Sequence, residues 1–280
     1  MTDNKVLTLQ DISCYGQCSL TVALPIISAC GVETVILPSA VLSTHTGGFT
    51  GYTFRDLTED IPKILEHWKK EGISFKCLYT GYLGSITQIE YVTALRESVV
   101  DRDGLLIVDP AMADNGSLYY GFDQTFVEHM AGLCKTADII LPNITEAAFM
   151  TGAEIRLSDH DEEYIDSLLD KLSKLGCKKV CLKGICYKPD EIGVVVYDCT
   201  SGKKDYYFTE KIKKSSHGTG DCYASAFVGA LMQGRDTIEA ARIAADFVVE
   251  SIKHTVDDER HVYGVKFERA LPMLVRELNK

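Results

Sequence analysis

Short apolar runs alternate with amphipathic stretches along most of the chain. Runs rich in Val, Ile and Leu, typical of buried parallel strands, lie at 5–9, 34–37, 75–79, 104–108, 139–141 and 179–182. Stretches with apolar residues at helical spacing lie between them, at 20–30, 58–70, 86–95, 123–134 and 161–175. This alternation predicts an α/β fold with helices on both faces of a mostly parallel sheet.

The last third of the chain departs from this alternation. The segments 192–198 and 205–208 are rich in β-forming residues and flank a Thr-Ser-Gly-Lys turn, which predicts an antiparallel hairpin. Helices are predicted after it, from Asp221 to about Gly234, at 236–254 and at 267–278. No repeat, low-complexity linker or change in composition divides the chain. We therefore predict a single three-layer α/β/α domain over residues 1–280, with the hairpin added to its central sheet.

Polar residues follow several predicted strands. Asp11 and Ser13 lie in a loop after the first strand, Tyr82 lies in a loop after 75–79, and Asp109 follows 104–108 directly. In open α/β sheets, ligands bind outside the carboxyl ends of the strands. An aromatic ring there can stack on a flat ligand, although plain packing explains Tyr82 equally well.

Two further strands end in residues with more than one interpretation. Asn143 and Glu146, three positions apart, resemble a capping box at a helix start. Glu146 could in addition order water around Mg²⁺, which usually keeps several waters. Lys183 follows 179–182. Between the second strand and the next helix, the polar, glycine-rich segment 42–49 is predicted to be a loop or a short edge structure. It contains His45 and Thr46, which are suited to binding a ring substituent or to a plain surface turn.

The stretch Gly218-Thr219-Gly220-Asp221 opens an apolar helix after a lysine-rich run that contains Lys211, Lys213 and Lys214. Its glycines let the backbone approach a ligand closely, and a helix start leaves N–H groups that suit an oxyanion. Asp221 is then either a helix cap or a base that takes a proton from an alcohol. The lysines are either a solvated surface or an attraction for triphosphate.

Charge and cysteine content narrow the classes of partner. The chain has 29 Lys and Arg against 40 Asp and Glu, a net charge of −11 that argues against nucleic-acid binding. No apolar run reaches the ~18 residues that a membrane span needs. No signal peptide precedes the first strand, so we expect a cytoplasmic protein whose ten cysteines are thiols. Cys177, Cys181 and Cys186 match no zinc spacing and are predicted to be small buried hydrophobes.

Three common nucleotide motifs are absent. Tyr223 stands where the dinucleotide fingerprint needs its third glycine, and the motif lies far from the first strand. The sequence contains neither a G-x-x-x-x-G-K-[ST] loop nor the signature set of protein kinases.

The remaining motifs resemble those of a known family. Gly218-Thr219-Gly220-Asp221 resembles the anion hole and base of the ribokinase-like superfamily. Within it, the order and spacing of four further segments resemble pyridoxal kinases: Leu42-Ser43-Thr44-His45-Thr46-Gly47, Thr80-Gly81-Tyr82-Leu83-Gly84-Ser85, Asp109-Pro110 and Pro142-Asn143-x-x-Glu146.

This resemblance implies ATP-dependent phosphorylation of a hydroxymethyl group on a substituted pyridine, a form of vitamin B6. Asp221, of ordinary pKa, would accept the alcohol proton while the backbone of Gly218, Thr219 and Gly220 stabilises the transferring group. The family's Mg-ATP side corresponds to Asp109, Asn143, Glu146 and Lys183, with Asp109 and Glu146 near Mg²⁺. Its substrate side corresponds to Asp11, Thr46 and Tyr82, with Ser13 and His45 beside them. A homodimer is also implied, through the loop near residues 42–52.

One departure from the family concerns the first strand. Pyridoxal kinases usually read Gln-Ser-His there, whereas this chain reads Gln10-Asp11-Ile12. An aspartate can pair with a protonated ring nitrogen or an amine, so Asp11 is predicted to help select among pyridoxal, pyridoxamine, pyridoxine and the hydroxymethylpyrimidine of thiamine synthesis. A regulator that binds a vitamer or a nucleotide without catalysis is the alternative of a different class, and the intact Asp221 argues against it.

Overall fold

A nine-stranded, mostly parallel sheet forms the centre of the molecule. The computed structural model describes residues 4–213 and 217–280. The parallel strands are β1 (Lys5–Tyr15), β2 (Glu33–Thr44), β4 (Phe75–Thr80), β5 (Val100–Val108), β8 (Ile139–Ile140) and β9 (Lys179–Ile185). Antiparallel strands extend both edges: β3 (Phe54–Asp56) pairs with β2, and the hairpin β10 (Glu191–Asp198) and β11 (Lys204–Glu210) pairs with β9. The order is β11-β10-β9-β8-β5-β4-β1-β2-β3.

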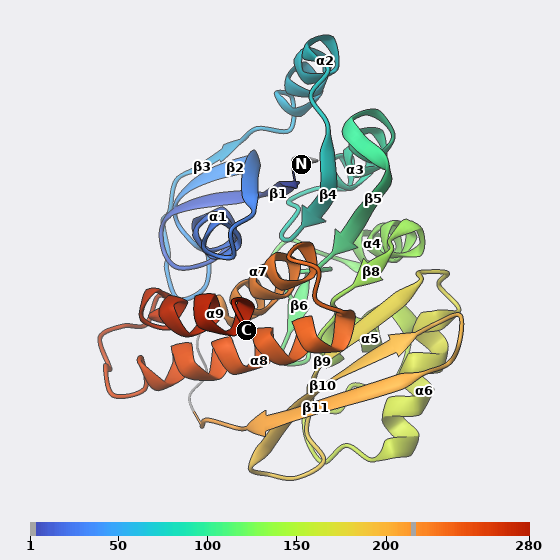
Figure 1. Ribbon diagram of the computed structural model, residues 1–280, viewed down its shortest axis with the longest axis vertical. Coiled ribbons are helices and arrows are strands. Elements are labelled where there is room, and N and C mark those ends of the chain that lie inside the picture. Colours follow the sequence, from blue (N-terminus) through green and yellow to red (C-terminus); the bar gives the residue numbers. More distant parts are fainter. Residues whose placement is uncertain (1–3, 214–216) are drawn as a thin grey trace.

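Helices cover both faces of this sheet, which confirms the predicted three-layer fold (Figure 1). One face carries α1 (Leu20–Ala29), α7 (Thr219–Met232), α8 (Thr237–Lys253) and α9 (Leu271–Leu278). The other carries α2 (Ile61–Glu71), α3 (Ile86–Val99), α4 (Gln124–Thr136), α5 (Ile144–Thr151) and α6 (Glu162–Ser173). None of the helices within residues 4–213 and 217–280 has the length and apolar character that crossing a bilayer requires.

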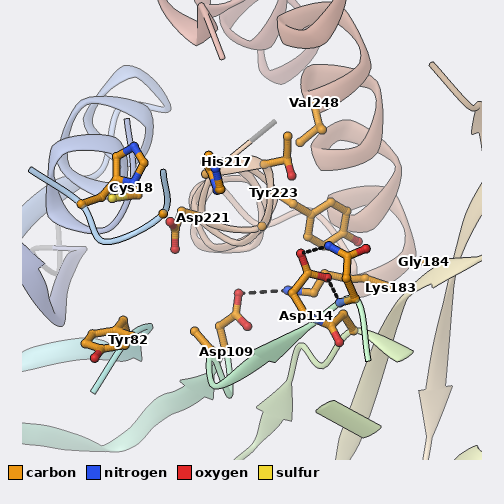
Figure 2. Close-up of a pocket in the computed structure, with 18 of the residues that line it drawn as sticks. Cys18, Tyr82, Asp109, Asp114, Lys183, Gly184, His217, Asp221, Tyr223 and Val248 are labelled. Carbon is orange, nitrogen blue, oxygen red and sulfur yellow. Dashed lines mark hydrogen bonds and ion pairs between the residues drawn. The ribbon is translucent and has the colours of Figure 1, made fainter. Parts of the chain in front are cut away.

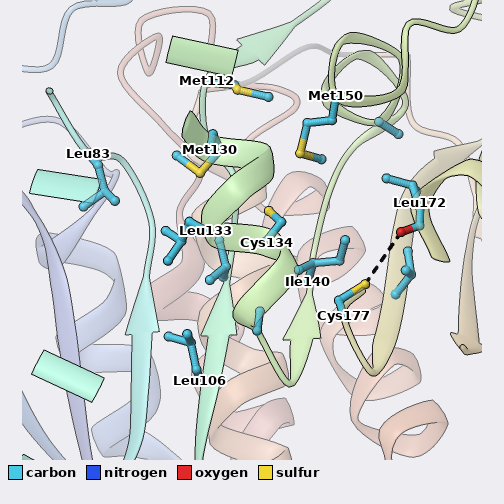
Figure 3. Close-up of a cluster of buried hydrophobic side chains, with 14 of the residues drawn as sticks. Leu83, Leu106, Met112, Met130, Leu133, Cys134, Ile140, Met150, Leu172 and Cys177 are labelled. Carbon is cyan, nitrogen blue, oxygen red and sulfur yellow. Dashed lines mark hydrogen bonds between the residues drawn. The ribbon is translucent and has the colours of Figure 1, made fainter. Parts of the chain in front are cut away.

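Each face of the sheet has its own apolar core. Figure 3 shows part of one core, in which Leu106 of β5 and Ile140 of β8 pack with Met130 and Leu133 of α4. Cys134 and Cys177 lie in the same cluster. All ten cysteines are free thiols and most are buried, as the sequence predicts.

The first strand is longer than its apolar run indicates. The run ends at Leu9, but β1 continues to Tyr15, paired with β2 past a register shift between Gln10 and Ile12. Asp11 and Ser13 therefore lie on a strand and not in the predicted loop. The pairing of β1 with β4 stops at Leu9, so this extension leaves the main sheet as a β1–β2 ribbon. The sequence did not predict this extension of β1, because a strand is recognised by apolar residues at every second position and the extension is interrupted by polar residues.

Two further predictions need correction. The second strand, predicted over 34–37, continues as β2 to Thr44, so the segment 42–49, predicted to be a loop or a short edge structure, begins on a strand. The predicted polar loop after Asp109 contains a small hairpin, β6 (Ala113–Asp114) and β7 (Ser117–Leu118).

The chain reverses its direction across the sheet after β2. It places β2 on one side of β1 and then crosses to place β4 on the other side. Such a switch point leaves a crevice outside the carboxyl ends of the strands, where the predicted site residues lie.

Candidate active site

A cavity of about 1390 Å³ lies at these strand ends and extends to the start of α7 and to the hairpin. Figure 2 shows Asp221 and Cys18 on one part of its wall and Tyr82, Asp109 and Lys183 on others. Every residue that the sequence predicts for the site lines this cavity: Asp11, Ser13, His45, Thr46, Tyr82, Asp109, Asn143, Glu146, Lys183, Gly218, Thr219, Gly220 and Asp221.

Asp221 lies in the first turn of α7 and is held from outside its own helix. Its Oδ2 accepts a hydrogen bond of 3.0 Å from the backbone N–H of Ser19. Burial raises the pKa of Asp221 to about 7, and the negative charges of Asp109 and Asp11 add to this effect. The sequence analysis expected an ordinary pKa, because loose phosphoryl transfer needs no stronger base and the helix dipole favours the ionised form. At neutral pH this carboxyl group can therefore both accept and release a proton.

Glycine is present at positions 218 and 220 for different reasons. Gly218 has φ of 74°, and a Cβ there would lie 1.8 Å from the carbonyl oxygen of Gln17, so only glycine fits. A Cβ on Gly220 would meet no heavy atom within 4 Å. The fold itself therefore does not require glycine at position 220, and the bare backbone there leaves open space in the cavity beside the helix start.

Ser19 and Asp11 form the wall next to Asp221. Ser19 is buried and has φ of 53° and ψ of −132°, a conformation that residues with a side chain rarely adopt. Asp11 is 5% exposed, and its Oδ2 accepts a hydrogen bond of 2.9 Å from Ser13 Oγ. Burial raises the pKa of Asp11 against the opposing effect of the Ser19 and Ser13 side chains. Ser19 was not predicted to belong to the site, because a serine before a helix is ordinarily a cap.

Aromatic rings form another part of the wall. Tyr82 stacks on Phe122 with ring centroids 5.5 Å apart, and burial raises its pKa to about 12. The His45 ring lies 5.2 Å from that of His217, and its buried Nε2 has no hydrogen-bond partner among the described residues. Burial lowers the pKa of His45, and His217 lowers it further. Thr46 lines the cavity beside these rings.

An ion pair connects the ends of β5 and β9. Lys183 Nζ lies 2.9 Å from Asp109 Oδ2, and both side chains are largely buried. Burial raises the pKa of Asp109, and the positive charge of Lys183 opposes it. Burial lowers the pKa of Lys183, but Asp109 and Glu146 outweigh this effect and the net shift is upward. Both groups are therefore positioned by each other within reach of a ligand in the cavity.

The predicted capping box is present in full. Asn143 Oδ1 accepts from the Glu146 N–H at 2.9 Å, and Glu146 Oε2 accepts from the Asn143 N–H at 2.8 Å. Glu146 Oε1 also accepts from the Met112 N–H at 3.3 Å. Burial raises the pKa of Glu146 well above its usual value, and the charge of Asp109 adds to it.

These contacts limit how the site could hold Mg²⁺. Within residues 4–213 and 217–280, no group of three or more His, Cys, Asp or Glu side chains is placed to hold a metal ion. Each Glu146 oxygen already accepts a backbone N–H, so this carboxyl fits contact through water better than direct ligation. Mg²⁺ characteristically keeps several waters and uses one or two carboxylates together with substrate phosphates. The residues present fit that mode of binding.

The far end of the cavity is apolar and was not predicted. One side of α8 and a segment of β10 line it, through Ala245, Val248, Val249, Ile252 and Ile192–Val194. The sequence of 236–254 does not distinguish this surface from the core side of the helix, because Ala245, Val248 and Ile252 also pack against the core. Lys211 and Lys213 line the cavity beside the hairpin, whereas Lys214 lies outside the described residues.

Comparison with known proteins agrees with the fold and the motifs. The phosphomethylpyrimidine kinase family matches residues 24–266. A pyridoxal kinase structure from Lactobacillus plantarum is 30% identical, covers 98% of this chain and 97% of its own, and superposes with a TM-score of 0.88. A structure from Bacteroides thetaiotaomicron, provisionally assigned as a phosphomethylpyrimidine kinase and crystallised with pyridoxal, is 34% identical, covers 98% and 96%, and has a TM-score of 0.91.

A curated relative is named for a pyrimidine substrate. The hydroxymethylpyrimidine/phosphomethylpyrimidine kinase of Aquifex aeolicus is 26% identical over 70% of this chain and 72% of its own length. Relatives of both kinds thus share the fold and the kinase activity class. The chain belongs to the phosphomethylpyrimidine kinase family and is a kinase of the ribokinase-like superfamily.

Proposed function

We propose that this kinase transfers the γ-phosphoryl group of ATP to the hydroxymethyl group of a vitamin B6 vitamer. The observation that carries the proposal is Asp221, a buried carboxyl with a pKa of about 7 that lies at a helix start behind Gly218 and Gly220. A general base is most effective when its pKa lies near the working pH. The cavity around Asp221 has room for an acceptor ring and for a nucleotide.

The transfer would proceed in one step. The hydroxymethyl oxygen attacks the γ-phosphorus, its proton passes to Asp221, and the bond between the γ-phosphorus and the departing ADP oxygen breaks. Because such transition states are loose, positioning and electrostatic stabilisation contribute more than the strength of the base. The backbone N–H groups at the start of α7, which follows Gly218, would donate to the transferring group.

The nucleotide would occupy the half of the cavity away from Tyr82. The apolar residues of α8, among them Val248 and Ile252, offer a surface for the base, and Lys183 and Asp109 lie nearer the phosphates. A bound Mg²⁺ supplies charge neutralisation between the phosphates. Asp109 would contact it, and Glu146 would hold one of its waters.

The acceptor ring would occupy the other half, beside Tyr82, Thr46 and Asp11. Two observations support a B6 vitamer over hydroxymethylpyrimidine. The Bacteroides thetaiotaomicron structure was crystallised with pyridoxal, and the Lactobacillus plantarum structure, of nearly equal length, is a pyridoxal kinase. Hydroxymethylpyrimidine kinase is the second candidate, because the family description and the Aquifex aeolicus relative favour it.

The test is an ATP-dependent kinase assay on pyridoxal, pyridoxamine, pyridoxine and hydroxymethylpyrimidine. We expect a B6 vitamer to have the highest kcat/KM. We also expect Asp221→Asn to lower kcat about 10²- to 10⁴-fold with little change in KM, because a general base contributes about that much. The exposed Asp190, which lies in a turn outside the cavity, provides the matched control Asp190→Asn.

Two results would reject the proposal. A highest kcat/KM with hydroxymethylpyrimidine would select the second candidate. Turnover of the Asp221→Asn variant near that of the control would remove Asp221 from the role of base.

A further inference from the structure

Asp11 is a buried carboxyl without a cationic partner among the described residues. It is 5% exposed, lines the cavity, and accepts a hydrogen bond from a neutral hydroxyl, that of Ser13. In the described part of the chain, no Lys or Arg lies within ion-pair distance of it. Buried carboxylates are normally paired because an isolated charge away from water is costly.

The lysines that line the cavity do not pair with Asp11, and two of them, Lys211 and Lys213, lie beside the hairpin. Lys183 is paired with Asp109 on the far side of the cavity. His45 has a lowered pKa, caused by burial and by His217, so it carries no charge near neutral pH. Asp11 therefore has no positively charged partner among the described residues.

Asp11 and Asp221 influence each other electrostatically. The charge of Asp11 is one of the causes that raise the pKa of Asp221, and both carboxyls raise the pKa of the Cys18 thiol, which lies beside Asp221 in Figure 2. Ser19 connects them, because its N–H binds Asp221 and its side chain influences Asp11. This connection uses a strained backbone at Ser19, and strain of this kind persists where the surrounding structure requires a particular geometry.

We propose, building on the proposed function, that Asp11 determines specificity by pairing with an aliphatic ammonium that lies next to the reacting hydroxymethyl group of the acceptor. Pyridoxamine is the vitamer with this chemistry. Its aminomethyl group is on the ring carbon beside the one that carries the hydroxymethyl group, so the ammonium and the reacting oxygen are close together. Two adjacent carboxyls then have separate tasks: Asp221 accepts the proton, and Asp11 pairs with the ammonium.

Pyridoxal and pyridoxine have an aldehyde and an alcohol at that position. Neither carries an aliphatic positive charge, so each would leave Asp11 unpaired in a cavity closed by its ligand. Discrimination follows from the penalty of leaving a buried charged group without a partner. The serine found at this position in the pyridoxal kinase pattern offers a neutral hydrogen bond and would lack this preference.

The test compares vitamers in the wild-type kinase and in Asp11→Asn, which keeps the shape of the side chain and removes its charge. Calorimetric titration gives Kd and steady-state assays give kcat/KM for pyridoxamine, pyridoxal and pyridoxine. We expect Asp11→Asn to raise Kd for pyridoxamine about 10- to 100-fold, because the lost pairing of buried charges is worth that much. Binding of pyridoxine should change less than about threefold. Asp11→Ser should give the same pattern, and Asp190→Asn should leave all three vitamers unchanged.

The possible outcomes separate this inference from the function on which it rests. Turnover of B6 vitamers by the wild type, with an equal loss for all three in Asp11→Asn, would assign Asp11 a structural role and overturn the inference alone. An unchanged ranking of the vitamers would do the same. Failure of the wild type to bind or phosphorylate any B6 vitamer would overturn both. A thermal melt of each variant shows whether it is folded.

Discussion

At the scale of single residues, the fold requires glycine at position 218, whereas we attribute glycine at position 220 to ligand binding. The fold requires the first, because its φ is positive and the Gln17 carbonyl occupies the place of a side chain. The second has open space around its missing Cβ and lies at the exposed start of α7. A substitution at each position therefore has a different expected consequence.

We expect Gly218→Ala to destabilise the folded protein by about 2 kcal/mol or more, through strain and overlap with Gln17. Gly220→Ala should leave stability unchanged or raise it by up to about 1 kcal/mol, because alanine favours a helix. The same Gly220→Ala change should lower kcat/KM for ATP at least about tenfold, because the methyl group would occupy the cavity beside the helix start. Denaturant unfolding and ATP kinetics of both variants provide the measurements. A normal kcat/KM in Gly220→Ala would show that no phosphate approaches this backbone.

Asp221 should cost stability at neutral pH. Its pKa is about 7 in the folded chain and near 3.8 when unperturbed, so the folded state binds more protons between these values. The free energy of unfolding that this group contributes therefore falls as pH rises from about 4 to 7. We expect Asp221→Asn to be more stable than the wild type by about 4 kcal/mol at pH 8, with a smaller difference at pH 5. Equal differences at the two pH values would contradict the raised pKa.

At the scale of elements, the Lys183–Asp109 ion pair joins β9 to β5 across the short strand β8. Removing one member leaves the other buried without a partner. We expect Lys183→Met to lower the free energy of unfolding by about 3–5 kcal/mol, and the double variant Asp109→Asn/Lys183→Met to recover much of that loss. Chemical denaturation of both variants is the measurement. If the double variant is no more stable than the single one, the loss has another origin.

The capping box at the start of α5 provides a second test at this scale. Asn143→Ala removes the oxygen that accepts the Glu146 N–H and should lower stability by about 1–2 kcal/mol. Asn143→Ser keeps an acceptor at the cap and should lose less. Thermal melts compare the two. Equal losses would indicate that the bond from Asn143 Nδ2 to the Ala113 carbonyl, and not the cap, stabilises this helix start.

The elements themselves were largely predictable from the sequence, because apolar spacing reports which side of a helix or strand is buried. The predictions failed where polar residues are buried in the wall of the cavity. Asp11 and Ser13 break the alternation that identifies a strand, yet β1 runs through both. Ser19 gave no signal, because its role depends on contact with a residue about 200 positions away. The raised pKa of Asp221 likewise depends on burial by distant segments.

At the scale of the whole molecule, the cavity divides into two halves contributed by different parts of the chain. The proposed acceptor half comes mainly from residues before Ser85, with His217 beside His45, whereas the nucleotide half comes from residues after Gly104. Asp221 lies where the halves meet, as the motif order predicts. The homodimer and the single-domain organisation stay predictions.

Mg²⁺ should stabilise the folded protein only when ATP is bound. With no set of three metal-ligating side chains among residues 4–213 and 217–280, we expect MgCl₂ alone to leave Tm unchanged. ATP with Mg²⁺ at about 100 times its Kd should add about 2.7 kcal/mol, which shifts Tm by several degrees. Adding EDTA should remove most of this shift. A rise in Tm with MgCl₂ alone would reveal a metal site that needs no phosphate.

The two-part origin of the cavity has a consequence for how such kinases can diversify. One exchange of sequence within α3, between Ser85 and Gly104, would join the acceptor-binding part of one relative to the phosphate-donor part of another. The switch point between β1 and β4 lies entirely within the first part. A hybrid of this kind would inherit its choice of alcohol from its amino-terminal parent, and its base and nucleotide contacts from the other. Recombination, as well as point substitution, could thus change which substrate a member of this family phosphorylates.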